Sequence, residues 1–133
     1  MPHCLRPTLR RRLAEDRGSM ALELSMVFPV VLLMLFAIIQ GGFWFHARQV
    51  AHHAAQRGVD AQRAYDAAPG AGAAAAGEFL AGTGGSLNAP SVSVSTGGGQ
   101  VSVEVRGSVI TLLPGIRMPV VQRVQAPREE FTP

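Results

Sequence analysis

The side chains that could do chemistry gather around one long apolar run. Glu23 stands at the start of this run, and His46, His52 and His53 follow its end. A carboxylate inside a membrane segment costs on the order of a few kcal/mol near the centre, less toward the interface, and usually has a partner. Glu23 is therefore expected either to pair with a positive charge or to reach the headgroup level.

The three histidines raise the question of a metal site. Two ligands on one face of a helix are normally four residues apart, and no pair of these histidines has that spacing. His46 and His53 share a face only at a separation of two turns. We therefore expect solvated or headgroup-level histidines and no metal.

No other grouping predicts catalysis. The chain after the apolar run has no cysteine and no recognisable Ser/His/Asp motif, and Glu78 and Glu104 are isolated carboxylates that we expect to be solvated. Its glycines do not form a phosphate-binding fingerprint. The single cysteine, Cys4, precedes the apolar run and has no partner for an intramolecular disulfide. The sequence predicts a protein that is not an enzyme and carries no cofactor.

The apolar run has the length and composition of a transmembrane helix. Residues 24–45 read LSMVFPVVLLMLFAIIQGGFWF and carry no charge. At about 1.5 Å per residue they span roughly 30 Å, the thickness of a hydrocarbon core. Phe43, Trp44 and Phe45 close the run, where an aromatic belt would lie. We predict one membrane span over about residues 23–45.

The arginines predict the orientation of this span. A basic leader, residues 1–18, precedes it and contains Arg6, Arg10, Arg11, Arg12 and Arg17. Basic flanks stay in the cytoplasm, so the chain after Arg48 is expected to be extracytoplasmic. The same cluster accounts for the net charge of +3 without nucleic-acid binding. The alternative is a cleavable secretory signal, whose apolar core is usually shorter and ends at a small-x-small cleavage site.

The helix is predicted to continue beyond the membrane, over residues 19–68 in all. Pro29 lies inside the span, where it removes the hydrogen bond to the carbonyl of Ser25 and should bend or loosen the helix. Outside the span the helix carries small residues at i, i+4 spacing, a pattern that lets helices pack closely. These are Ala47, Ala51 and Ala55, with Gly58 one register over. The pattern indicates either subunit packing or plain helix propensity.

The chain after this helix predicts a linker followed by strands. Residues 69–90 are rich in glycine and alanine and are expected to form a linker with a short helix near residues 73–81. Residues 91–95 and 101–105 alternate valine with polar side chains around a glycine-rich turn, which predicts a hairpin.

Two further strands are predicted around the turn at Pro114-Gly115, over residues 109–113 and 120–125. The fold class is therefore an α+β membrane protein. Its long N-terminal transmembrane helix extends outside the membrane and is followed by a small antiparallel β-rich region, residues 91–133.

The start of the span resembles the type IV prepilin processing site. Arg17-Gly18-Ser19 precedes Ala21-Leu22-Glu23-Leu24, and in prepilins a peptidase cuts after the glycine and leaves glutamate as the fifth mature residue. The resemblance implies cleavage of the bond between Gly18 and Ser19. It also implies that Glu23 pairs with the N-terminal amine of an adjacent subunit.

Among pilin-like proteins, the chain resembles the TadE/TadG-like family of the Flp pilus, or tight-adherence, system. The shared features are the Arg-Gly leader end, the Ala-x-Glu entry, Pro29, and the element Ala54-Ala55-Gln56-Arg57-Gly58-Val59, within about residues 17–63. Leu24 departs from the aromatic residue that is frequent in the family, and the C-terminal half has no matching motif.

The resemblance implies a pseudopilin that acts as a minor subunit or assembly factor of the pilus. Its partners would be the lipid bilayer, a prepilin peptidase, other pilin-like subunits and Tad inner-membrane assembly proteins. The alternative is an unprocessed bitopic membrane protein with a small extracytoplasmic binding domain. Gly18 and Glu23 discriminate between the two, because only the pseudopilin needs them.

Overall fold

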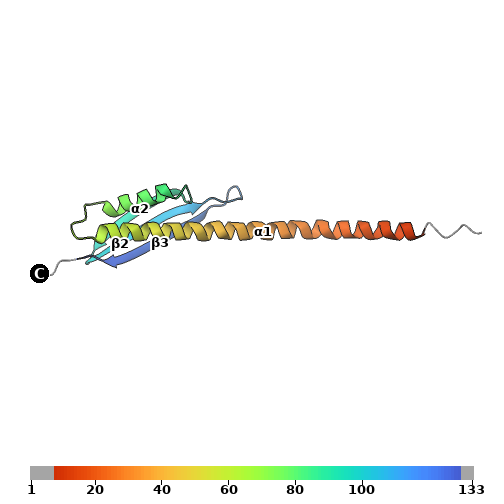
Figure 1. The fold of residues 1–133 in the computed structure, drawn as a ribbon, viewed down its shortest axis with the longest axis horizontal. Coiled ribbons are helices and arrows are strands. Elements are labelled where there is room, and N and C mark those ends of the chain that lie inside the picture. The colour runs from red at the N-terminus through yellow and green to blue at the C-terminus, as the bar shows by residue number, and fades with distance from the viewer. Residues whose placement is uncertain (1–7, 130–133) are drawn as a thin grey trace, which may run out of the picture. The chain divides into compact units, whose positions relative to one another are not determined.

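The computed structural model describes the backbone of residues 8–129 and the side chains of residues 18–129. Within these residues the elements follow the order α1, α2, β1, β2, β3 (Figure 1). The chain divides into two compact units at residue 38, and α1, Thr8–Arg63, contributes to both. The predicted α+β fold with one long apolar N-terminal helix is confirmed.

The first unit consists of the N-terminal part of α1. This helix begins at Thr8, ahead of the predicted residue 19, so that the second part of the leader is helical as well. The leader from Thr8 onward contains no proline and, before Ser19, only one glycine, which permits helix formation. Residues 1–7 of the leader, including Cys4, lie outside the described residues.

The helix α1 ends at Arg63, earlier than the predicted residue 68. The amide of Ala67 donates to the carbonyl oxygen of Ala64 at 3.2 Å, and Asp66 adopts a positive φ of 65°. Pro69 follows, and a proline disfavours helical geometry in the residue before it. A short turn therefore separates α1 from the next helix.

The second helix, α2, covers Ala71–Gly82 and confirms the short helix predicted inside the linker. Gly70 precedes it with a φ of 84°. The side-chain oxygen of Gln62, near the end of α1, accepts a hydrogen bond of 3.0 Å from the amide of Gly72. This bond satisfies one of the free amides of the first turn of α2.

The three strands form one antiparallel sheet in the order β1-β2-β3. They are β1, Asn88–Gly97; β2, Gln100–Val109; and β3, Met118–Pro127. The predicted hairpin is confirmed: Gly98 and Gly99 connect β1 to β2 with φ values of 60° and 72°. Positive φ at both central residues matches the twist of the strands that such a turn joins.

Of the two further strands predicted, one is correct and one is wrong. Residues 120–125 lie inside β3, but only Val109 of residues 109–113 belongs to a strand. The hydroxyl of Thr111 lies 3.0 Å from the carbonyl oxygen of Leu113 and 2.7 Å from that of Ile116. Residues 110–117 therefore form a loop around Pro114-Gly115, across which this hydroxyl makes its contacts.

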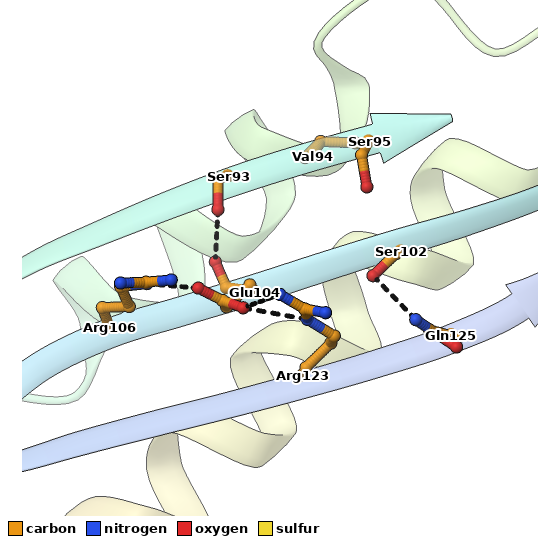
Figure 2. Close-up of a pocket in the computed structure, with 8 residues that line it drawn as sticks. All are labelled: Ser93, Val94, Ser95, Ser102, Glu104, Arg106, Arg123 and Gln125. Atoms are coloured by element: carbon orange, nitrogen blue, oxygen red, sulfur yellow. Dashed lines mark hydrogen bonds and ion pairs between the residues drawn. The ribbon is translucent and has the colours of Figure 1, made fainter. Parts of the chain in front are cut away.

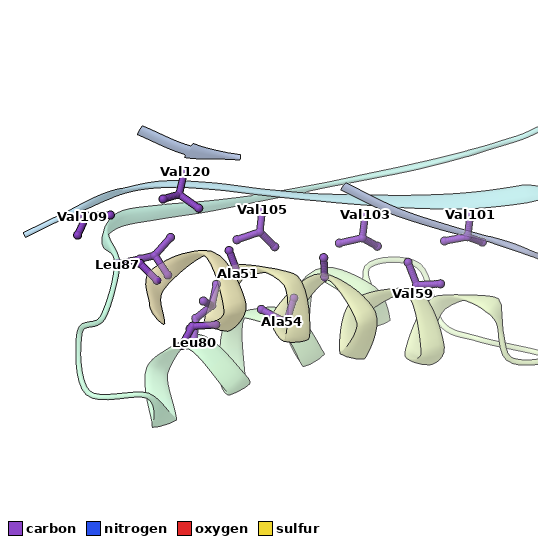
Figure 3. Packing of buried hydrophobic residues seen from close by; sticks show 14 residues of the cluster. Ala51, Ala54, Val59, Leu80, Leu87, Val101, Val103, Val105, Val109 and Val120 are labelled. Carbon is purple, nitrogen blue, oxygen red and sulfur yellow. The ribbon is translucent and has the colours of Figure 1, made fainter. Parts of the chain in front are cut away.

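The core lies between one face of the sheet and the outer half of α1 (Figure 3). The side chains of Val101, Val103 and Val105 on β2 are completely buried and point toward Ala51, Ala54 and Val59 of α1. Val92 and Val94 of β1 lie opposite Val105 and Val103 on the same face. The alternation of valine read from the sequence therefore defines the buried face.

Candidate processing and assembly site

The residues predicted to direct processing lie on the exposed first unit of α1. Gly18, Ser19, Glu23 and Leu24 are all exposed. A Cβ atom built on Gly18 would meet no atom within 4 Å. Since a glycine inside a helix costs roughly 0.5–1 kcal/mol relative to alanine, the packing of the chain gives no reason for glycine at this position.

Glu23 follows Ser19 by four residues, and residues with this spacing lie on the same face of a helix. Among the side chains of residues 18–129, none forms a hydrogen bond or an ion pair with Glu23. The described part of the chain therefore leaves this carboxylate available to a group from outside it.

Pro29 lies within α1, which continues through it without interruption. Proline removes the donor that would normally bond to the carbonyl of Ser25. The hydroxyl of Ser25 donates to the carbonyl oxygen of Ala21 at 2.8 Å. This hydroxyl is satisfied inside the helix, as an apolar environment requires.

From Leu22 to Ile38 the apolar part of α1 is exposed around its whole circumference. Within the described residues it is the one helix long and apolar enough to cross a membrane, and none of its most apolar window is buried in the protein. The exposed apolar side chains include Leu22, Met26, Phe28, Val30, Leu33, Met34 and Ile38. A helix that is apolar on all sides and uncovered by its own chain is typical of a membrane span.

The small residues beyond the span pack inside the chain. Ala47, Ala51 and Ala55 are at most 1% exposed. A Cβ atom on Gly58 would lie 2.9 Å from the carbonyl oxygen of Gly72 on α2 and 3.0 Å from Cγ1 of Val103 on β2. These small residues therefore pack against the chain's own sheet and second helix, and this face is covered within the chain.

On the outer face of the sheet lies a charged cluster that the sequence did not reveal (Figure 2). Glu104 is only 7% exposed, so the expectation of a solvated carboxylate is wrong. One of its oxygens accepts a hydrogen bond of 2.9 Å from Nε of Arg123, whose Nη2 forms an ion pair with it, and the other bonds to Nε of Arg106. The hydrogen bonds from Arg123 and Arg106 lower the pKa of Glu104 below its ordinary value.

The cluster depends on strand register. Glu104 and Arg106 are two residues apart on β2 and so share a face, whereas Arg123 lies directly opposite Glu104 on β3. The cluster lines a shallow hollow of about 270 Å³ together with Ser93, Ser95, Ser102 and Gln125. The sequence shows that Glu104 and Arg106 are spaced to share a face of a strand. That Arg123 joins them could be predicted only with the pairing register between β2 and β3.

The histidines have protein neighbours. Nε2 of His52 lies 3.1 Å from Nε2 of Gln56, and Nδ1 of His53 lies 3.3 Å from Oε1 of the same side chain. Among the described residues, no group of three or more metal-binding side chains occurs. The rings of His52 and His53 thus both contact the side-chain amide of Gln56.

Comparison with known proteins finds a similarity for one N-terminal segment of the chain. Residues 18–60 match the model of a family described as TadE-like protein. No curated protein and no solved structure matches the chain. The matched segment begins at Gly18, contains Glu23 and Pro29, and ends before α2 and the sheet. Over this N-terminal segment the chain is similar to TadE-like proteins.

Proposed function

We propose that this protein is a membrane-anchored pseudopilin, a minor subunit or assembly factor of a Flp/Tad-type pilus or secretion apparatus. The observation that carries the proposal is the TadE-like match over residues 18–60, which begins at Gly18 and contains the whole exposed apolar run. The role is structural and not catalytic.

The membrane anchor is the apolar part of α1, over about residues 23–45. Its surroundings must be apolar because its side chains as far as Ile38 are exposed on all sides. The arginine-rich leader stays in the cytoplasm, and the second unit, with α2 and the sheet, is extracytoplasmic.

Processing by a prepilin peptidase after Gly18 would turn Ser19 into the N-terminus. The new amine would lie four residues before Glu23, a rise of about 6 Å along the helix. A carboxylate and an ammonium group that are both close to lipid are stabilised when they pair, because each is costly alone. Pairing between the amine of one subunit and Glu23 of the next would fix their relative register.

The contacts with other subunits then fall on the exposed apolar helix. The alanine and glycine face beyond Ala47 is already covered by β2 and α2. The large side chains from Leu22 to Ile38 are uncovered. The pilin-like partners would accordingly pack against this part of α1 within the bilayer.

The test compares two glycines of the same helix. Gly18→Val is expected to block conversion to the shorter form in cells that contain a prepilin peptidase, as seen by gel mobility. Gly41→Val is the matched control, since a Cβ atom at Gly41 also meets no atom within 4 Å, and it should be processed normally. Normal processing of Gly18→Val would favour the unprocessed bitopic protein or a different cleavage site.

A further inference from the structure

The loop between β2 and β3 exposes an unusual number of large apolar side chains. Residues 110–117 read Ile-Thr-Leu-Leu-Pro-Gly-Ile-Arg, and no charge occurs before Arg117. Four of the side chains are about half exposed: Ile110 at 54%, Leu112 at 47%, Leu113 at 55% and Ile116 at 51%. Clustered apolar groups of this kind on a surface mark an interaction site. We refer to residues 110–117 as the apolar loop.

Several polar groups of the apolar loop are bonded within the protein. The hydroxyl of Thr111 lies within bonding distance of the carbonyl oxygens of Leu113 and Ile116. The amide of Leu112 donates to Oε1 of Gln40 at 3.0 Å, and Nε2 of Gln40 lies 3.5 Å from the carbonyl oxygen of Ile110. Each polar group bonded in this way lowers the cost of moving the loop out of water.

Gln40 also fixes the level of the apolar loop along α1. It is one of the two polar side chains in the apolar run, and it lies five residues before Phe45, a rise of about 7.5 Å. Phe43 and Phe45, the aromatic residues at the outer end of the run, are 46% and 59% exposed. The apolar loop is therefore held beside the outer end of the predicted membrane span.

We infer that the apolar loop inserts into the outer surface of the lipid bilayer and gives the extracytoplasmic unit a second membrane contact. The occupant is lipid because Gln40 holds the loop at the outer end of the apolar run, where Phe43 and Phe45 are also exposed. Arg117 ends the apolar stretch where a cation can reach the headgroups. This inference rests on the proposed membrane location of α1.

The other end of the sheet has the opposite character. The turn between β1 and β2 holds Gly98 and Gly99 and is flanked by Thr96 and Gln100. In an antiparallel sheet this turn and the β2–β3 loop lie at opposite ends. One end is thus apolar and the other polar, as expected if only the loop end meets the bilayer.

The test measures the depth of nitroxide labels in the full chain, in a Cys4→Ser background, reconstituted in vesicles of phosphatidylethanolamine and phosphatidylglycerol. Labels are placed one at a time at Leu113→Cys and Ile116→Cys in the apolar loop. Leu33→Cys is the reference within the span, and Gln100→Cys is the reference at the polar end of the sheet. Power saturation compares collisions with oxygen, which concentrates in lipid, and with a water-soluble nickel chelate.

The expected result is that both loop labels favour oxygen, as the Leu33 label does, while the Gln100 label favours the nickel chelate. Loop labels as accessible to nickel as the Gln100 label, with the Leu33 label still in lipid, would overturn the inference and leave the membrane anchor intact. A Leu33 label accessible to nickel would instead overturn the membrane location on which both proposals rest. Agreement between the two loop labels guards against a local effect of either substitution.

Discussion

Gly58 of α1 and Gly72 of α2 meet backbone to backbone, so closely that a Cβ atom on Gly72 would stand 2.7 Å from the carbonyl oxygen of Gly58. A Cβ atom on Gly58 would lie 2.9 Å from the carbonyl oxygen of Gly72. Real side chains essentially never approach a backbone atom so closely, and a backbone oxygen cannot swing aside as a side chain can. The two helices can therefore keep this separation only with glycine at both positions.

Gly72→Ala is expected to destabilise the protein by about 1–3 kcal/mol, the usual cost of an overpacked contact. Gly77→Ala is the matched control on the same helix, because a Cβ atom there meets no atom within 4 Å. It should be neutral or stabilising by up to about 1 kcal/mol, since alanine is the better helix former. Thermal unfolding in detergent, followed by circular dichroism, separates the two variants. Equal melting temperatures would show that the helices are not in contact through these glycines.

The lowered pKa of Glu104, caused first by the hydrogen bond from Arg123 and then by that from Arg106, predicts a loss of stability in acid. In the unfolded chain this carboxyl has its ordinary pKa of 4.5. The unfolded chain therefore takes up the proton at a higher pH than the folded one. The contribution of Glu104 to the free energy of unfolding is fully present above about pH 4.5. It is lost as the pH falls through the lower pKa that this carboxyl has in the folded chain.

Glu104→Gln should lower the melting temperature at pH 7 and make it less dependent on pH below pH 4.5. Glu78→Gln is the control, because Glu78 is an exposed carboxyl on α2. It should retain the acid dependence of the wild type. If Glu104→Gln had the same acid profile as Glu78→Gln, the cluster with Arg106 and Arg123 would not contribute to the folding of the sheet.

Glu23→Ala is expected to be processed but to associate poorly with pilin-like partners, because it removes the carboxylate that would pair with their N-terminal amines. Glu78→Ala, which removes an exposed carboxylate on α2 and lies outside this contact surface, should associate normally. Co-purification of the partners with a tagged protein from the membrane fraction measures the difference. Wild-type association of Glu23→Ala would support the bitopic alternative.

The sequence was most informative where periodicity was local. The alternating valines predicted the hairpin of β1 and β2, and the apolar run predicted the long exposed helix. The end of α1 was placed too late because helix propensity continues through Ala64, Ala67 and Ala68, whereas the chain turns at Asp66 with a positive φ. The preference of alanine for helix does not include the effect of Pro69 on the residues before it.

The relationships that were missed all depend on register or tertiary contact. Arg123 lies opposite Glu104 because β3 pairs with β2 in the register that sets Met118 opposite Val109. Residues 109–113, which were expected to form a strand, lie mainly in the loop before β3. From the sequence alone, the alanine and glycine pattern of α1 could be explained either by subunit packing or by plain helix propensity. A sequence pattern that favours close packing does not say which element packs there, and here it is α2 and β2.

The pseudopilin assignment can be tested by the intact mass of the membrane-fraction protein from cells with and without a prepilin peptidase. We predict a peptidase-dependent loss of the mass of residues 1–18 and an N-terminus at Ser19. The same unprocessed mass in both cells would contradict the pseudopilin assignment and leave a bitopic membrane protein. Cleavage after Phe45 would contradict the membrane anchor as well.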